Sequence, residues 1–368
     1  MSSNTSLNAA KNAQEDEFYT QLPDIENELR HYRKHFVGKT VLCNCDDPFE
    51  SNFFKYFALS FNKLHLKKLM ATSYAGSPIT GTQLSLFGDE TPERRRTPYK
   101  AVITSVHDVD GDGGVDMLDV AELFRSGENS CERLEGDGDF RSAECTRLLD
   151  EADIVVTNPP FSLIREYVAQ LIEHDKKFLI IGNQNAVKYK EIFPLFMDDH
   201  IWLGYNNGDM AFCVPDDYKP RKTRYWQDET GQKWRSMGNI CWLTNLDIKK
   251  RHDEIPLARR YDPQAYPTYV NYDAIEVPEV ADIPYDYAGE MGVPITFLNR
   301  YNPDQFEIVG INWSVLKDAV LSDDIRKNNE TARRLNFYLD RPDGRGNAYT
   351  RMYDRIVVRN KHPEEPRP

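Results

Sequence analysis

A strand-to-turn segment near the middle of the chain carries the residues best suited to chemistry. Asn158, Pro159, Pro160 and Phe161 follow the apolar run at 154–156 and Thr157. An amide oxygen and a proline carbonyl in such a turn can each accept one N–H bond of an exocyclic amine, which frees the nitrogen lone pair. The prolines stiffen the turn and remove backbone donors, and the aromatic ring can stack on a base. These four residues are the predicted catalytic residues for methyl transfer to a nucleobase amine; an ordinary proline-rich turn is the alternative.

The elements around this turn are expected to place it at the edge of a sheet. Residues 153–157 are typical of a short buried strand. Ser162 is the expected N-cap of a following helix, whose apolar residues Ile164, Tyr167, Val168, Leu171 and Ile172 share one face. A turn between a strand and a helix is where open α/β sheets bind ligands. Further strands are predicted at 40–45, 66–72, 99–106, 178–182, 201–205, 210–214 and 240–244, and a helix at about 23–36, so the fold class is α/β.

Composition limits the class of protein. The 368 residues are 40% hydrophobic and 12% aromatic, which is enough for a substantial core. There is no apolar run near the roughly 20 residues of a membrane helix and no apolar signal segment at the N-terminus. The six cysteines are scattered, which indicates neither a disulfide framework nor a zinc site and favours a cytoplasmic location. The net charge of −13 disfavours nucleic-acid binding, so local basic patches matter.

The first predicted strand ends in acidic residues. Asp46, Asp47 and Pro48 follow it, and carboxylates there can accept hydrogen bonds from a cationic amine or a ribose. The absence of Gly-x-Gly argues against a dinucleotide pyrophosphate. S-adenosylmethionine lacks a pyrophosphate and carries positive groups that suit acids. Asp139 and Phe140, one helix before the central strand, can bond to and cover its adenine; an acidic turn is the alternative reading of that segment.

A loop at 218–226 interleaves cations with aromatic residues. This pattern suits phosphate contacts and base stacking, and a solvated basic hairpin is the alternative. The predicted DNA-binding residues are Lys219, Arg221, Lys222, Arg224, Tyr225 and Trp226.

The segment at 108–119 is rich in Asp and Gly. Its acids fall at positions one, three, five, nine and twelve of a calcium loop, with glycine at position six. A strand precedes it where a helix is expected, and Asp119 replaces the bidentate Glu. A β-turn between strands explains the segment without metal, so we expect no metal site here.

Domain organisation follows from shifts in composition. Residues 1–15 are expected to form a disordered leader and residues 16–250 a catalytic domain, within which 75–120 form a polar insert or hairpin. From 251 to 368 the chain is rich in Tyr, Pro and Asp, which indicates a second, mixed α+β lobe with short strands at 295–298, 306–311 and 355–358.

Several segments together resemble the EcoRI-type adenine-specific DNA methyltransferases. They are Asp16-Glu17-Phe18-Tyr19-Thr20, Cys43-Asn44-Cys45-Asp46-Asp47-Pro48, Asp137-Gly138-Asp139-Phe140-Arg141-Ser142, Asn158-Pro159-Pro160-Phe161, Gly292-Val293-Pro294-Ile295-Thr296-Phe297 and Tyr301-Asn302-Pro303-Asp304-Gln305-Phe306. The resemblance implies a seven-stranded Rossmann-like methyltransferase sheet, S-adenosylmethionine as donor and the N6 amine of a flipped adenine as acceptor. The C-terminal lobe would then recognise the target.

The resemblance also implies roles for single residues. Phe18, Tyr19 and Thr20 would hold the methionine end of the donor. Asp46 would stand at the donor-binding end of the first strand, and Asp139 with Phe140 would contact the donor adenine. The chain departs from the wider amino-methyltransferase pattern, because Asp46-Asp47-Pro48 replaces a glycine-rich loop. An acidic ribose ligand after the second strand is also missing.

The leading hypothesis is a site-specific adenine N6-methyltransferase acting on double-stranded DNA. It would work as a monomer, alongside a separate cognate restriction endonuclease, and the resemblance suggests GAATTC as the recognition sequence. One alternative is an N-methyltransferase acting on an RNA base or a protein Gln. Another is a non-catalytic nucleic-acid-binding module, which leaves the Asn158–Phe161 turn unexplained.

Overall fold

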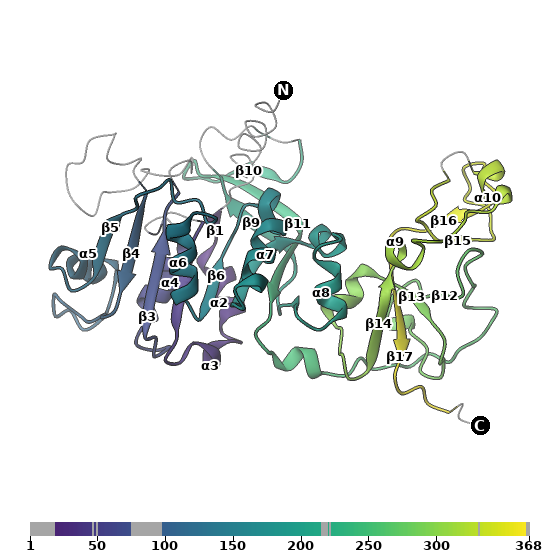
Figure 1. The fold of residues 1–368 in the computed structure, drawn as a ribbon, viewed down its shortest axis with the longest axis horizontal. Helices are drawn as coiled ribbons and strands as arrows, with labels where there is room; N and C mark the ends of the chain where they lie inside the picture. The colour runs from purple at the N-terminus through teal and green to yellow at the C-terminus, as the bar shows by residue number, and fades with distance from the viewer. Residues whose placement is uncertain are drawn as a thin grey trace. The chain divides into compact units, whose positions relative to one another are not determined.

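The computed structural model describes residues 19–45, 48, 51–74, 98–214, 220, 222–329 and 332–365. The predicted leader and most of the predicted insert therefore lie outside the described residues. The chain forms two compact units (Figure 1). The first comprises Met1–Ile192 with Ile201–Leu246, and the second comprises Phe193–His200 with Asp247–Pro368.

The first unit is built on a mixed sheet of 11 strands. In spatial order the main path is β1 (Tyr19–Thr20), β9 (Gly208–Cys213), β11 (Lys233–Thr244), β7 (Lys177–Asn183), β6 (Ile154–Thr157), β2 (Thr40–Cys43), β3 (Lys68–Thr72), β4 (Tyr99–Ile103) and β5 (Ser130–Arg133), and β8 (Trp202–Leu203) and β10 (Tyr225–Gln227) also pair with β11. The four central strands, β7, β6, β2 and β3, are parallel. The outer strands pair antiparallel. This arrangement confirms the predicted Rossmann-like α/β class, with more strands than the seven expected.

Helices cover both faces of this sheet. They are α2 (Leu22–Leu29), α3 (Arg33–Phe36), α4 (Asn52–Leu59), α5 (Met117–Arg125), α6 (Ala143–Glu151) and α7 (Ile164–Glu173), with short 3-10 turns η2 (Phe161–Leu163) and η3 (Gln184–Lys188). Trp242 on β11 packs against Phe53 of α4, whereas the next residue, Leu243, lies with Ile164 of α7 around Gly182. Because successive strand residues point to opposite faces, α4 and α7 lie on opposite faces of the sheet.

The predicted helix at 23–36 is divided in the structure. It ends at Leu29 and resumes at Arg33. Tertiary contacts account for the break: the His31 ring stacks on Tyr205 at 3.6 Å, and the buried Glu28 carboxylate accepts a 2.8 Å hydrogen bond from the Tyr205 N–H. The prediction of one continuous helix was therefore wrong.

The second unit contains a four-stranded sheet in the order β12 (Ile275–Glu276), β13 (Met291–Pro294), β17 (Arg355–Asn360) and β14 (Phe306–Ile311), and a separate pair, β15 (Tyr338–Leu339) and β16 (Thr350–Arg351). Its short helices are α8 (Phe193–Met197), α9 (Asn312–Val315) and α10 (Asp323–Asn328), with 3-10 turns η4 (Lys249–His252), η5 (Val280–Asp282) and η6 (Ile295–Asn299). Tyr269 and Phe337 stack at 4.4 Å in its core. The strand predicted at 295–298 is wrong, because η6 occupies these residues.

Two features of composition have structural counterparts. All six cysteines are free, as the scattered spacing predicted. Among the described residues, each helix is too short or too polar to cross a membrane.

Candidate active site

The order of the central strands creates a switch point between β2 and β6. From β2 the chain continues to its neighbour β3 on one side, and from β6 it continues to β7 on the other. Loops that leave neighbouring strands in opposite directions open a crevice at the carboxyl ends of the strands, where α/β proteins bind ligands. Asn44 and Cys45 leave β2 at this edge, and Asn158 leaves β6.

The turn after β6 is held by buried structure. All four β6 residues are buried, and Asn158 itself is 7% exposed. The Leu163 N–H donates a 2.9 Å hydrogen bond to the Pro160 carbonyl, which closes a 3-10 turn at Phe161–Leu163. Helix α7 therefore begins at Ile164, and the exposed Ser162 does not cap it. The predicted strand and helix are confirmed, and the predicted cap is wrong.

Asn44 connects the ends of β2 and β6. The Thr157 hydroxyl donates to the Asn44 backbone carbonyl, and the Tyr167 hydroxyl donates to the Asn44 side-chain oxygen. All three residues are buried. Sequence reasoning missed this cluster, because Asn44 falls within an otherwise apolar strand pattern and Tyr167 reads as an ordinary core residue.

The backbone at the end of β2 is left-handed at Cys45, with φ +83°. Residues other than glycine adopt this conformation rarely and with some strain, and such positions cluster at functional sites. Cys45 thus makes at this strand end a turn of the kind that glycine usually supplies. The next residue, Asp46, lies outside the described residues, so its predicted donor contact stays a prediction.

The segment containing Asp139 and Phe140 packs over the end of β3. Gly138 has φ +81°, and a Cβ added there would lie 2.1 Å from the Ser73 carbonyl oxygen. Ser73 is itself fixed by a 2.9 Å hydrogen bond from its N–H to the Tyr99 carbonyl. The turn therefore lies at the carboxyl edge of the parallel strands, on the β3 side of the switch point.

Arg141 contacts Asp139 and Phe140, the two residues of this turn that are predicted to bind the methyl donor. Its Nε donates to Asp139 Oδ1 at 2.9 Å and its Nη2 donates to Asp139 Oδ2 at 2.6 Å. Its guanidinium also lies 5.2 Å from the Phe140 ring centre, while the Tyr167 ring meets Phe140 edge-on at 5.0 Å. The Arg141 hydrogen bonds lower the pKa of Asp139 below its usual value, against the raising effect of burial. Arg141 was not predicted as a site residue, although it adjoins two that were.

Strand β1 brings Thr20 to the same edge. The Asn52 side chain, at the start of α4, donates a 2.8 Å hydrogen bond to the Thr20 carbonyl. The Thr20 hydroxyl is buried and forms no hydrogen bond with any described residue. Tyr19 pairs through its backbone with Cys213, and Phe18 lies outside the described residues. Thr20 therefore lies beside the start of α4, the first helix after β2.

The basic and aromatic loop forms a hairpin of β10 and β11. Ile240 of β11 pairs with Asn183 at the end of β7, and residues 233–239 continue beyond that edge to meet β10 (Figure 1). Trp226 and Trp234 are cross-strand partners whose rings are nearly parallel, with centres 6.2 Å apart. The Trp234 Nε1 donates a 2.8 Å hydrogen bond to Asp228, which fixes its ring, while Trp226 stays 42% exposed.

The cations of this hairpin differ in their surroundings. Arg224 donates a 3.0 Å hydrogen bond to Asp209, and a Cβ on Gly238 would lie only 2.7 Å from the Arg224 guanidinium. Lys222 is exposed and Tyr225 is half-buried. Lys219 and Arg221 lie outside the described residues. Asp209, which holds Arg224, was not predicted as a residue of this surface.

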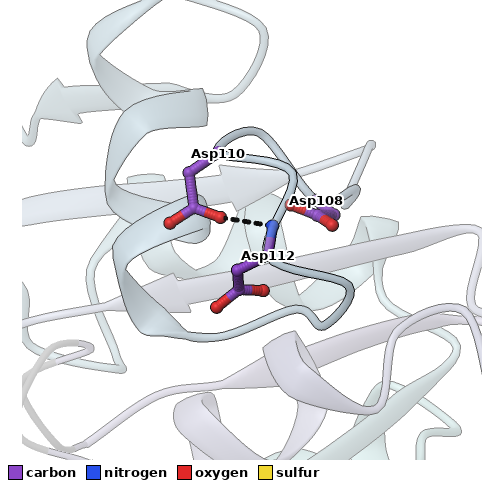
Figure 2. A group of neighbouring side chains, drawn as sticks. All are labelled: Asp108, Asp110 and Asp112. Atoms are coloured by element: carbon purple, nitrogen blue, oxygen red, sulfur yellow. Dashed lines mark hydrogen bonds between the residues drawn. The ribbon is translucent and has the colours of Figure 1, made fainter.

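The acidic loop gathers three carboxylates. Oxygen atoms of Asp108, Asp110 and Asp112 lie within 4.8 Å of one another (Figure 2). Their oxygens accept backbone N–H groups of the same loop, including those of Gly111 and Gly113.

The last two acids of the calcium-like pattern cap the following helix, and Asp119 also accepts a 2.8 Å hydrogen bond from the Val109 N–H in the loop. Asp116 and Asp119 form a capping box at the start of α5. A helix therefore follows this loop, and the predicted β-turn between strands was wrong.

Comparison with known proteins identifies the family. The family described as "Adenine-specific methyltransferase EcoRI" matches residues 6–361. The Type II methyltransferase M.EcoRI of Escherichia coli is 46% identical over 312 residues, which cover 83% of this chain and 89% of the relative. The Type II methyltransferase M.MpnI of Mycoplasma pneumoniae is 35% identical and M.MgeORF184P of Mycoplasma genitalium is 34% identical, each over 96% of this chain and 98% of the relative. No solved structure matches. The resemblance predicted from sequence is confirmed, and the chain belongs to the EcoRI family of adenine-specific DNA methyltransferases.

Proposed function

We propose that this enzyme transfers a methyl group from S-adenosylmethionine to the N6 amine of an adenine flipped out of duplex DNA, at one short sequence. The observation that carries the proposal is the Asn158–Phe161 turn at the carboxyl end of buried β6, at the switch point of the sheet. Inside a duplex the N6 amine is engaged in base pairing, so the base must leave the helix to reach such a turn.

The turn supplies acceptors and a stacking surface. The Asn158 side-chain oxygen and the Pro159 carbonyl accept the two N–H bonds of the amine, which releases the lone pair for attack. Pro159 and Pro160 have no backbone N–H, so neither adds a donor that would compete for these acceptors. Phe161 follows within a closed 3-10 turn and stacks on the base. As the bond from nitrogen to the methyl carbon forms, the C–S bond would break with its electron pair left on sulfur. The methylated amine is then cationic and acidic and would release one proton to water, so no strong general base is required.

The donor fits the segments around the switch point. S-adenosylmethionine supplies an electrophilic methyl carbon on a sulfonium. Thr20 contributes a buried hydroxyl without a partner among the described residues, a ready hydrogen-bonding group for the methionine end, which Phe18 and Tyr19 would also hold. Asp46 stands after β2 for the polar part of the donor.

Asp139 and Phe140, in the turn that packs over the end of β3, would contact the adenine of the methyl donor. Asp139 keeps acceptor capacity at Oδ2, which accepts one hydrogen bond from Arg141, whereas Oδ1 accepts both the Arg141 backbone N–H and its Nε.

The hairpin of β10 and β11 is the proposed contact with the DNA strands. It extends past the sheet edge that carries Asn158, and it presents Lys222 and the Trp226 ring to solvent. Cations of this kind contact phosphates, and exposed aromatic rings stack on bases. Lys219, Arg221, Arg224 and Tyr225 would complete this surface. An acidic protein needs such a local patch, because its net charge of −13 repels DNA as a whole.

Recognition of a sequence requires surface beyond the catalytic sheet. The second unit, with its own sheet and core, provides it, and we assign target recognition to residues 251–368. The named relatives are Type II methyltransferases. We propose that this chain likewise modifies sites that a separate restriction endonuclease would cut, and that it acts on one strand at a time as a monomer.

The test is transfer of labelled methyl from S-adenosylmethionine into duplexes with and without GAATTC, followed by separation of the nucleosides. Wild-type enzyme is expected to label N6-methyladenine. Asn158→Ala is expected to lose about a hundredfold or more of the rate, as when one aligned polar group is removed from a reacting centre. Asn27→Ala, an exposed asparagine of α2, is the matched control and should keep full activity.

Each other outcome has a definite meaning. Label in RNA but not in DNA would overturn duplex DNA as the substrate. Full activity of Asn158→Ala would overturn the assignment of the catalytic turn. Label in the duplex that lacks GAATTC would support the proposed reaction but would show that GAATTC is not the target sequence.

A further inference from the structure

One buried asparagine touches two of the loops that form the site. Asn44 is the residue between β2 and Cys45, where the predicted donor loop begins. Its backbone carbonyl accepts the hydroxyl of Thr157, the residue directly before Asn158. The loop assigned to the donor and the turn assigned to the target base are therefore bonded to each other through Asn44.

Tyr167 adds the third segment of the site. Its hydroxyl donates to the Asn44 side chain, and its ring packs edge-on against Phe140 with ring centres 5.0 Å apart. Tyr167 belongs to α7, the helix that follows the Asn158–Phe161 turn. Its side chain is fully buried, and burial raises its pKa well above the usual tyrosine value. The hydroxyl therefore remains protonated and donates throughout the physiological range.

These hydrogen bonds join three buried residues. Buried hydrogen-bond networks fix a single arrangement, because an unsatisfied buried group is unfavourable. A shift of the loop after β2 must move Asn44, and with it the acceptors of Thr157 and Tyr167. A shift of the turn that begins at Asn158 would move Thr157 and so act on the Asn44 carbonyl to which Thr157 is hydrogen-bonded.

We propose that Asn44 and Tyr167 are positioning residues that couple occupation of the donor site to the geometry of the Asn158 turn, so that donor and target base bind cooperatively. This inference rests on the proposed function, since it takes the loop after β2 as the donor site and the Asn158 turn as the base site. Neither residue touches the reacting atoms in this scheme. Their effect is an interaction free energy between two sites, which is reciprocal: each ligand strengthens the other by the same factor.

The decisive variant is Tyr167→Phe, which removes one hydroxyl and keeps the ring against Phe140. The affinity of S-adenosylhomocysteine, an unreactive stand-in for the donor, is measured by calorimetry with and without a target duplex. We expect wild-type enzyme to bind it at least about fivefold more tightly with the duplex, the lower end of typical coupling factors. In Tyr167→Phe this ratio should fall to near one.

A second readout follows the base directly. A duplex with 2-aminopurine at the target adenine reports extrusion of the base by its fluorescence. Added S-adenosylhomocysteine should increase the signal for wild-type enzyme and leave it nearly unchanged for Tyr167→Phe. A residue with only a structural role would alter thermal unfolding without altering the effect of one ligand on the other.

Matched variants isolate the network. Thr157→Val removes the bond at the other end and should reproduce the loss of coupling, whereas Thr157→Ser keeps the hydroxyl and should restore it. Tyr32→Phe also removes a buried phenol hydrogen bond in the same unit, to Glu28 on α2, and should leave coupling unchanged. Equal loss in Tyr32→Phe would show a general structural effect and overturn the inference.

The remaining outcomes separate this inference from the proposed function. A wild-type ratio of one, or full coupling in both Tyr167→Phe and Thr157→Val, overturns the inference even when methylation proceeds normally. Absence of N6-methyladenine with wild-type enzyme overturns the proposed function, and it is read in a different assay from the binding ratio.

Discussion

Gly138 lies against Ser73 so closely that a Cβ on the glycine would be 2.1 Å from the serine carbonyl oxygen. The contact joins the turn that carries Asp139 and Phe140 to the end of β3. It explains why glycine occupies this position, because both the space and the φ of +81° exclude other residues without strain.

Gly138→Ala should weaken donor binding. Strain of this kind amounts to about 1–3 kcal/mol, so we expect the dissociation constant of S-adenosylhomocysteine to rise by about tenfold, measured by calorimetry. Gly136→Ala is the matched control, because nothing lies within 4 Å of its Cβ position. Unchanged binding in Gly138→Ala would separate this turn from the donor site.

Trp226→Ala should weaken DNA binding and leave donor binding intact. Loss of one stacked base is worth about 1–3 kcal/mol, and Trp226 is the exposed member of the Trp226–Trp234 pair. Trp226→Phe keeps an aromatic face and should recover most of the affinity. Fluorescence anisotropy with a labelled duplex measures both variants, and equal affinity of Trp226→Ala and wild type would remove the hairpin from the interface.

Lys222→Ala should reduce the salt dependence of DNA binding. Each phosphate contact contributes about 0.9 to the slope of log K against log salt, so removing one exposed cation should lower the slope by about that amount. Lys63→Ala, also exposed but between α4 and β3 at the opposite edge of the sheet, should not change it. The titration is repeated at several salt concentrations, and identical slopes for the two variants would contradict a phosphate contact at Lys222.

The hydrogen-bonded pair of Asp139 and Arg141 predicts the pH range in which the Asp139 carboxyl titrates. Hydrogen bonds from Arg141 lower the pKa of Asp139 below 3.8, although burial acts in the other direction. A lowered folded-state pKa means that this stabilisation is complete above the unfolded value and is lost as pH falls through the folded value. Arg141→Gln should therefore move the Asp139 midpoint upward.

The midpoint is read from the Asp139 carboxyl signal in an NMR titration. Arg125→Gln, which removes an exposed pair with Glu122, should leave the Asp139 midpoint in place. A midpoint that does not move in Arg141→Gln would contradict the hydrogen bonds described for this turn.

Glu276→Ala should destabilise the second unit strongly. Glu276 and Arg355 form a bidentate pair with exposures of 3% and 12%, and the closest distance between them is 2.7 Å. Leaving the buried guanidinium unpaired should cost about 3–5 kcal/mol. Hydrogen exchange of β13, β14 and β17 measures the loss. Glu307→Ala breaks an exposed pair with Arg359 and should cost no more than about 1 kcal/mol; similar losses in both variants would show that burial does not set the energy of the pair.

The turn at Asn158–Phe161 and the central strands could be predicted because local signals agree there. Ile154–Thr157 is apolar and β-branched, prolines follow it, and the helix has a clear apolar face, so pattern and turn chemistry gave one answer. The start of the helix was placed wrongly, because the Pro160 carbonyl closes a 3-10 turn first. Sequence patterns do not specify such backbone bonds.

The missed residues depend on contacts between distant segments. Asn44 and Tyr167 are 123 positions apart, and Arg141 also donates a hydrogen bond to Glu166, which lies 25 positions further along the chain. The division of the predicted helix at 23–36 has the same origin, because His31 stacks on Tyr205. Spacing along the chain carries no signal for these pairs.

Strand β11 divides into two regions that differ in burial and in the strands with which they pair. Residues 240–244 are buried beside β7, whereas residues 233–239 are half-buried or exposed and carry the hairpin. The outer region also pairs with β9, which in turn pairs with β1 and its residue Thr20. A hairpin grafted from a relative would therefore have to keep the β11 residues that pair with β9, while β10 and the turn that connects it to β11 could be exchanged.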